Sequence, residues 1–510
     1  MDKTNVDTNE LQNETPIVAL ASMTDEPAVV HRLEQRSELE KLTSDSTVAA
    51  AVMVFAAIAA VFVANSPAYV AVHEVFAAPF SLGLGPFAFS ITLEQFINDG
   101  LMTLFFMLVG VELKYEMTVG QLRHPKQAAL PMLAAVGGVA APALIYLAIN
   151  AGGATHGWAT PIATDIAFAI GVMSLLGDRI APETKIFFQT LAIADDILAI
   201  VVLALFYGQT IDVMWVAASL AAVFGLWLLN RARVYSLKPY TVVGIILWFC
   251  MYNSGIHATL AGVILAFFLP VRSDVRLDDL RGWLHTEGVK LDDEYDDESH
   301  VLGQHDFTAA AWAVERVMHH VRPPLQRAER NLSAPVNFII LPLFAFVNAQ
   351  VRVVGADPMA ILADPIAQGV FAGAVLGKPI GIIGITFILV KTGLFSLPEH
   401  VNWRQIVAVG IMGGIGFPMS ILIAGLAFSP AETNAAKCAI LAAAVVSSAV
   451  GLLYAHIADA VSRCGRGKRP AAQWRPPPAP PQPARLRCTH RGRNRTRSRR
   501  WPGSQRRVPA

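Results

Sequence analysis

Long apolar runs recur along this chain, and they constrain its fold more than any other feature of the sequence. A transmembrane helix needs about 20 mostly apolar residues to cross a bilayer core of about 30 Å, and a helix satisfies its own backbone hydrogen bonds in lipid. Such runs recur from Thr47 to about residue 462, and 54% of the 510 residues are hydrophobic whereas 15% are charged. The sequence therefore predicts an all-α polytopic membrane protein.

The apolar runs predict twelve transmembrane helices, provided that residues 240–270 form two helices rather than one. The stretch TVVGIILWFCMYNSGIHATLAGVILAFFLP fits one long helix or two short helices broken at Asn253-Ser254-Gly255. Cytoplasmic loops collect Lys and Arg, and with two helices here every second connection is basic. We therefore expect two helices and place both termini in the cytoplasm. The expected spans cover residues 47–65, 93–113, 127–149, 157–177, 184–207, 213–230, 240–252, 255–270, 334–348, 366–390, 405–428 and 437–460.

The remaining segments have other compositions. Residues 1–46 are polar and acidic, which predicts a disordered cytoplasmic segment without a cleavable signal peptide. The membrane domain is expected in two parts, with eight spans in 47–272 and four in 328–462. Residues 273–327 between them predict an acidic, solvated and partly disordered cytoplasmic loop. Residues 463–510 carry 15 Lys and Arg and no Asp or Glu, and this Pro/Arg-rich composition predicts a disordered tail.

Few ionisable residues fall within the predicted spans. Each costs about 2.5 to 3.5 kcal/mol to insert, so each is a candidate for function. Two of them, Asp195 and Asp196, are adjacent in the apolar stretch LAIADDILAIVVLALFY. Two carboxylates in a low dielectric do not easily carry two negative charges, so at least one should bind a proton unless a cation arrives. Cation and proton would then compete for one site, which is the chemistry of exchange; the alternative is an Asp–Lys pair that only joins helices.

The other intramembrane candidates are less specific. Glu112 and Glu116 lie one helical turn apart at a cytoplasmic helix end, where ordinary interfacial charge explains them equally well. A lone membrane histidine such as His257 is more often a packing residue than a sensor. The full set is Asp99, Asp165, Asp195, Asp196, His257 and Lys378, with Glu112 and Glu116 at the helix end.

Glycine and proline interrupt two of the predicted spans. The interruptions are Pro161, Thr164 and Gly171 near Asp165, and Gly413, Gly414, Gly416 and Pro418 in a late span. Such interruptions in the two halves of a transporter predict discontinuous helices that cross near the membrane midplane. Asp165 can then offset the partial positive charge of helix N-termini, and Lys378 the partial negative charge of C-termini.

Seven motifs occur in a fixed order between residues 47 and 460. They are NDGLMTLFFMLVGVELKYE, ATDIAFAIGVMSLLG, LAIADDILAIVVLALFY, SGIHATLAGVI, LPLFAFVNA, GKPIG and GGIGFPMSI. Together they resemble the motifs of the NhaA family of bacterial sodium/proton antiporters. The resemblance implies inverted-topology repeats, two broken helices that cross near the midplane, and electrogenic export of sodium or lithium in exchange for protons, which serves pH and sodium homeostasis.

The resemblance also implies a cation and proton site. Asp196 would be the principal cation ligand and Asp195 its partner, so that sodium lies at Asp195 and Asp196. Asp195 would pair with Lys378 and release it when its protonation changes. Thr164 and Asp165 would line the site at the broken helix.

A second group of residues matches positions that the family links to the pH response. Glu112, Glu116 and Glu329 look like the acids of the family's cytoplasmic funnel, and His257 matches a histidine that affects the pH response. Asp99 matches an acid of secondary importance.

Five positions depart from the family pattern. Tyr115 stands where an Arg is usual, and Arg330 and Ser333 stand where histidines are frequent, which puts the pH-activation profile in question. Pro418 replaces a frequent Thr and could alter the second broken helix, whereas Ala194 is a mild change.

We therefore expect a secondary transporter of the bacterial inner membrane, not an enzyme, with sodium or lithium ions and protons as substrates. The proton gradient would drive it without a cofactor, and no nucleic acid partner is expected. The hairpin VHEVFAAPFSLGLGPFAFS occupies the place through which many family members form homodimers. One rival is a sodium-coupled symporter of an organic anion, but the spans are mostly Ala, Gly and Val rather than polar. The other is an intramembrane aspartyl protease, whose Tyr-Asp and Gly-x-Gly-Asp contexts surround neither Asp165 nor Asp195.

Overall fold

The computed structural model describes residues 46–466 apart from short gaps at 85–86, 124, 178–179, 209–210, 274, 276, 298, 353, 355–357 and 399–400. The chain forms two compact units, Met1–Val461 and Ser462–Ala510, and the helices and strands below belong to the first unit, except that the last helix runs on to Arg466. The predicted disorder of the N-terminal segment and of most of the tail lies outside the described residues.

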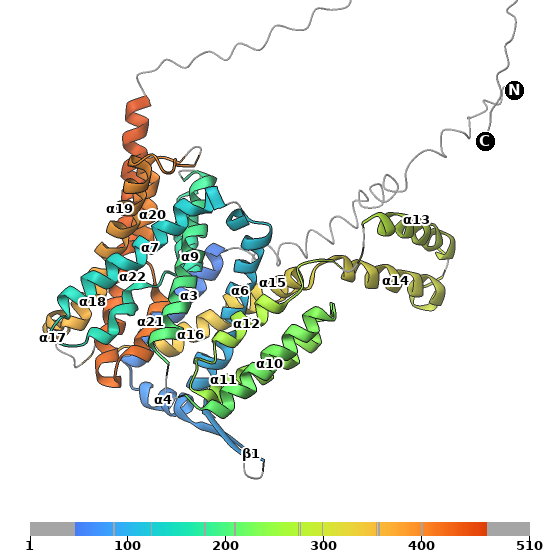
Figure 1. The fold of residues 1–510 in the computed structure, drawn as a ribbon, viewed down its shortest axis with the longest axis horizontal. Helices are drawn as coiled ribbons and strands as arrows, with labels where there is room; N and C mark the ends of the chain where they lie inside the picture. The colour runs from blue at the N-terminus through green and yellow to red at the C-terminus, as the bar shows by residue number, and fades with distance from the viewer. Residues whose placement is uncertain are drawn as a thin grey trace, which may run out of the picture. The chain divides into compact units, whose positions relative to one another are not determined.

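The described residues are mostly helical (Figure 1). The part before the large loop contains α3 (Ser46–Ala64), α4 (Tyr69–Ala77), strands β1 (Pro79–Leu84) and β2 (Phe87–Thr92), α5 (Leu93–Gln95), the π-helix η1 (Phe96–Leu101), α6 (Met102–Thr118), the short 3₁₀-helix η2 (Gln121–Arg123), α7 (Pro125–Ile149), the 3₁₀-helix η3 (Thr155–Ile162), α8 (Ile166–Ser174), α9 (Pro182–Phe206), α10 (Val213–Arg231), α11 (Leu237–Ser254) and α12 (Leu260–Phe268). The part after the loop contains α15 (Pro324–Pro335), the π-helix η6 (Val336–Ile340), α16 (Leu341–Asn348), α17 (Pro358–Ala363), α18 (Pro365–Ala372), the π-helix η7 (Gly373–Gly377), α19 (Lys378–Lys391), α20 (Trp403–Met412), α21 (Phe417–Ala427) and α22 (Pro430–Arg466).

The helices confirm a polytopic all-α membrane protein. Among the described residues, eight segments are long and apolar enough to cross a membrane, and the bent pair α20–α21 raises the number to nine. The other three expected spans correspond to shorter or less apolar helices, namely η3–α8, α11 and α12. The total of twelve spans therefore stays a prediction.

Residues 240–270 form two helices, as the loop charges predicted. α11 ends at Ser254, and α12 begins at Leu260. Gly255 ends α11 with a φ of +81°, a left-handed conformation that glycine adopts without the steric cost of a side chain.

The loop after α12 differs from the expectation of partial disorder. It contains α13 (Leu277–Glu294), a 3₁₀ turn η5 (Val301–Gly303) and α14 (His305–Val321), which lie side by side in Figure 1. The Tyr295 and Phe307 rings lie 5.1 Å apart, and the Gln304 amide donates to the backbone oxygens of Asp296 and Ser299. The acids of the run that suggested disorder lie in the last turn of α13 and in the turn that follows, and those between 292 and 297 are exposed, so they do not oppose the packing of the two helices.

The hairpin β1–β2 lies in the place expected after the first span. Its strands pair antiparallel from Pro79 opposite Thr92 to Leu84 opposite Phe87. Thr92 then caps the next helix in a capping box with Gln95, so strand and helix follow each other without a loop.

Helices α7 and α19 approach each other through glycine, and this contact fixes the start of α19. A Cβ on Gly381 would collide with the carbonyl of Gly137, whose carbon lies 2.6 Å from that position. Lys378 lies one turn before Gly381, so the close approach holds Lys378 against α7.

Replacing Gly381 by alanine is expected to cost about 1 to 3 kcal/mol of stability, because the added methyl group overpacks this contact. Gly384, in the same helix, has open space around its Cβ position. Gly384→Ala is therefore the matched control and should be neutral or stabilising by about 0.5 to 1 kcal/mol. Thermal melting of both purified variants in detergent measures the difference, and equal melting temperatures would contradict the close contact.

Candidate functional site

The adjacent aspartates lie in the middle of the 25-residue helix α9, where the helix is enclosed by its neighbours. Every residue from Leu191 to Asp196 is buried, with Asp195 0% and Asp196 3% exposed. Apolar side chains of other helices surround this level, including Ile382 of α19 and Met412 of α20. The pair is thus withdrawn from water, as the sequence predicted.

Lys378 pairs with one of the two acids. Its Nζ donates to Asp195 Oδ2 at 2.6 Å and to Thr164 Oγ1 at 2.9 Å. All three side chains are fully buried. Burying a charged pair is costly, and close charge-assisted hydrogen bonds offset that cost. Three segments that are far apart in sequence therefore meet at one ammonium group.

The two interrupted spans are broken where the sequence predicted, and the breaks contact each other. Residues 163–165 are extended between η3 and α8, and residues 413–416 separate α20 from α21 with a bend of 44°. The Asp165 amide donates to the Ile415 oxygen at 2.8 Å, and Thr164 Oγ1 donates to the Gly413 oxygen at 3.0 Å. These bonds satisfy backbone groups that the helix interruptions leave free.

Local residues explain each break. Asp165 is the N-cap of α8, where its Oδ1 accepts from the Phe168 amide at 3.3 Å, a favoured role for aspartate. Gly416 touches the Ala163 carbonyl so closely that a Cβ would collide with it. Pro418 occupies the second position of α21, where its missing N–H breaks no bond within the helix. The proline found in place of threonine therefore fits the break.

Within the part of the chain that the structure describes, three buried carboxyl oxygens at the crossing have no hydrogen-bond partner. They are Asp165 Oδ2, Asp195 Oδ1 and Asp196 Oδ1. The charges that act on Asp196 include those of Asp195, Asp165 and Lys378. A buried polar atom without a partner is costly, and a bound proton or a hard cation, which prefers oxygen ligands, would relieve that cost.

The described residues can also be compared with the ligand sets of resident metal ions in proteins. Within the described residues, no group of three or more His, Cys, Asp or Glu is arranged to hold a metal ion. A sodium ion at the Asp pair would therefore need oxygens other than carboxylates to complete its coordination, and we treat it as a transported substrate.

The three predicted funnel acids come together, and the charge of one of them, Glu112, also acts on Asp196. The charges of Glu329 on α15 and Glu116 act on Glu112 of α6, and these two helices pack against each other. Lys114 lies on the same helix, and its Nζ donates to the backbone oxygens of Phe267 and Leu269 at 2.5 Å each. Lys114 therefore caps the C-terminal end of α12.

His257 and Asp99 are not joined to the Asp pair by any hydrogen bond or ion pair in the described part of the chain. His257 lies between α11 and α12, and its Nε2 is buried without a partner. Asp99 lies in the π-helix η1, and its backbone oxygen accepts from Trp248 Nε1 at 3.1 Å.

A pair of asparagines was missed by sequence reasoning. Asn348 Nδ2 donates to Asn98 Oδ1 at 2.6 Å, and Asn98 Nδ2 lies 3.4 Å from Asn348 Oδ1. The pair ties η1 to the end of α16. The sequence signal was an asparagine in each of two motifs, NDGL and FAFVNA, and nothing in either motif indicated that they meet.

Comparison with known proteins places this geometry in a family. Residues 40–455 match the family model described as Na+/H+ antiporter 1. The chain is 40% identical over 386 residues to the Na(+)/H(+) antiporter NhaA of Helicobacter pylori strain G27, covering 75% of this chain and 86% of that protein. It is 41% identical over 379 residues to the NhaA of Oleidesulfovibrio alaskensis, covering 74% and 84%.

A solved structure of a sodium proton antiporter from Methanocaldococcus jannaschii is also similar, with 14% identity, a TM-score of 0.38, and coverage of 71% of this chain and 85% of that one. That likeness is too low to support an argument. The family model and the relatives at about 40% identity are sufficient by themselves: the chain belongs to the NhaA family of sodium/proton antiporters.

Proposed function

We propose that this protein is a secondary transporter that exports sodium or lithium ions in exchange for protons, by alternating access across the bacterial inner membrane. The observation that carries the proposal is the buried Asp pair, in which Asp195 binds Lys378 while Asp196 keeps an oxygen without a partner. The relatives named above are Na+/H+ antiporters.

Competition at this pair is the proposed mechanism. When Asp196 is ionised it binds the cation, together with the free oxygen of Asp195, while Thr164 and Asp165 line the site at the crossing. When protons arrive they occupy the same oxygens and expel the cation. Lys378 holds Asp195 in the ionised state, and protonation of Asp195 releases Lys378. Because Asp195 and Lys378 titrate as a pair, the immediate proton carrier belongs to the pair rather than to one residue.

The stoichiometry follows from counting sites. The Asp195–Lys378 pair and Asp196 supply two places for protons but one place for a cation. More protons than cations would then cross in each cycle, so the exchange is electrogenic and the proton gradient drives it without a cofactor.

The cluster of Glu112, Glu116 and Glu329 is proposed to set the pH response, together with His257. Three acids whose charges act on one another take up protons over a range of pH rather than at one value. Tyr115, Arg330 and Ser333 replace ionisable or differently charged residues of the family, so the activation midpoint is expected to differ from that of other members.

Orientation and assembly complete the proposal. The distribution of Lys and Arg supports a cytoplasmic position for both termini. The β1–β2 hairpin extends beyond α4 in Figure 1 and exposes Phe80, which is 62% accessible. A second copy would pair there to form the homodimer.

Respiration-driven pH gradients in everted membrane vesicles test the function. Sodium or lithium chloride should collapse the gradient in vesicles that contain the protein, whereas potassium or choline chloride should not. An organic anion that collapses the gradient only together with sodium would favour the symporter instead. If sodium and lithium have no effect at any pH, although the protein is inserted and folded, the antiporter proposal is wrong.

Competition also predicts how the apparent KM for sodium depends on pH. Since protons occupy the cation site, the apparent KM should rise as pH falls, approaching about tenfold per pH unit where one proton competes. The maximal rate at saturating sodium should change less over the same range. Sodium titrations of the vesicle assay at several pH values measure both, and a KM independent of pH would exclude competition at a common site.

A further inference from the structure

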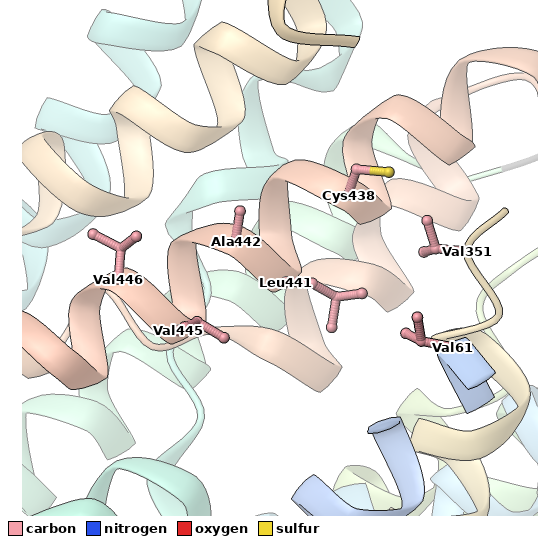
Figure 2. Close-up of a pocket in the computed structure, with 7 residues that line it drawn as sticks. All are labelled: Val61, Val351, Cys438, Leu441, Ala442, Val445 and Val446. Carbon is pink, nitrogen blue, oxygen red and sulfur yellow. The ribbon is translucent and has the colours of Figure 1, made fainter. Parts of the chain in front are cut away.

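An open groove lies between the end of α3 and the early turns of α22 (Figure 2). Its volume is about 450 Å³, and its walls include Val61 of α3, Val351 of the loop after α16, and Leu441 and Val445 of α22. Figure 2 shows Val61 and Val351 facing Leu441 and Cys438 across the groove. Val445 is 69% exposed, whereas Val351 is 1% exposed and lies at the floor.

The groove runs from the end of the membrane spans toward the bilayer interior. Val61 is in the last turn of α3, and Cys438 is in the early turns of α22. From Cys438 to Val446 the helix rises by about 12 Å at about 1.5 Å per residue. An elongated apolar groove of this depth matches the shape of a hydrocarbon chain, and its volume falls in the usual range of ligand sites, roughly 300 to 1,000 Å³.

A cation lies at the outer end of the groove. Arg352 follows Val351 directly, is exposed, and its guanidinium lies 5.2 Å from the centre of the Tyr69 ring. Asn65 holds the loop by donating to the Val351 oxygen at 2.8 Å and accepting from the Val354 amide at 2.7 Å. No carboxylate among the described residues pairs with Arg352. Its charge is therefore held in place and left available to a partner.

The position of Arg352 is unusual for this chain. In the expected topology, the connections on the outer side contain no Lys or Arg except Arg352, with Lys437 at a span edge. Lys437 interacts with the charge of Glu94. Arg352 is thus an isolated positive charge at the outer headgroup level, next to an apolar groove.

We propose that this groove binds one acyl chain of an outer-leaflet phospholipid whose anionic headgroup pairs with Arg352. The aliphatic wall accommodates the chain, and the guanidinium, oriented by the Tyr69 ring, hydrogen-bonds the phosphate. This inference does not depend on the transport proposal, because it concerns residues remote from the Asp pair.

Native mass spectrometry of the full-length protein in detergent tests the inference, with phosphatidylglycerol and phosphatidylcholine of identical acyl chains as probes. The wild-type protein should bind phosphatidylglycerol about fivefold more tightly than phosphatidylcholine, since one basic side chain at a headgroup contributes about that factor. Arg352→Gln should bring the ratio to about one, because it weakens phosphatidylglycerol more than the zwitterionic phosphatidylcholine. Leu441→Trp fills the groove and should weaken both lipids.

The control is Arg404→Gln, which removes an exposed arginine at the start of α20 and should leave the ratio unchanged. Melting curves verify that each variant is folded. If Arg352→Gln keeps the wild-type preference for phosphatidylglycerol, the headgroup assignment is wrong. This result does not depend on whether Leu441→Trp folds. If Leu441→Trp converts dimers into monomers without changing lipid binding, the groove is an interface between two copies and the proposal is wrong.

Discussion

Asp196→Asn is expected to abolish the sodium- and lithium-induced collapse of the pH gradient in everted vesicles. The loss should occur at every pH between about 6 and 9, the range around neutral pH. Asparagine keeps the shape of the side chain but carries no charge and takes up no proton. The variant therefore binds neither the cation nor the proton at this position, and its activity should fall to that of vesicles without the protein. The rate of gradient collapse after salt addition is the measurement.

The control for this variant is Asp212→Asn. Asp212 is the exposed N-cap of α10, where its carboxylate accepts from the Met214 amide, and asparagine caps a helix about as well as aspartate. Asp212→Asn should retain full activity. Sodium-dependent activity in Asp196→Asn equal to that of Asp212→Asn would mean that Asp196 is not the cation ligand.

Lys378→Met is expected to destabilise the protein by about 3 to 5 kcal/mol, because it leaves the Asp195 carboxylate buried without its counter-charge. The loss should be largest at high pH and should shrink as pH falls, since a protonated Asp195 needs no cation beside it. Thermal melting in detergent across pH measures this effect. Lys238→Met, at an exposed position, is the control and should leave the melting temperature unchanged.

A double variant separates the pair from its surroundings. Asp195→Asn combined with Lys378→Met removes both charges, so it should be more stable than Lys378→Met alone. If the double variant loses the sum of the two single losses, the 2.6 Å contact between Lys378 and Asp195 does not couple the two residues energetically.

The helical hairpin α13–α14 is one feature that the sequence did not predict. Composition counts acidic residues but does not record where they fall. In the structure Leu280 is buried, and the acidic residues of 292–297 are exposed. A segment with high average polarity therefore still forms two helices that pack against each other.

Local sequence by itself determined much of this protein. The length of the apolar runs required helices that cross a membrane, glycine and proline located both breaks, and Gly255 marked the end of α11. Asp195 and Asp196 could be identified as candidates because they lie in an apolar run. Burying a charge in a membrane is costly whichever residues surround it, so the sequence alone was sufficient for this step.

Tertiary structure alone decided what these residues contact. Lys378 lies 183 positions from Asp195 and 214 from Thr164, and no local pattern encodes which acid it selects. The choice depends on the glycine contact between α7 and α19 and on the hydrogen bonds between the two breaks, which bring Lys378 beside Asp195. The asparagine pair, the Lys114 cap and the groove beside Arg352 likewise exist only where helices from distant parts of the chain meet, because packing geometry is a property of the assembled helices and not of any one of them.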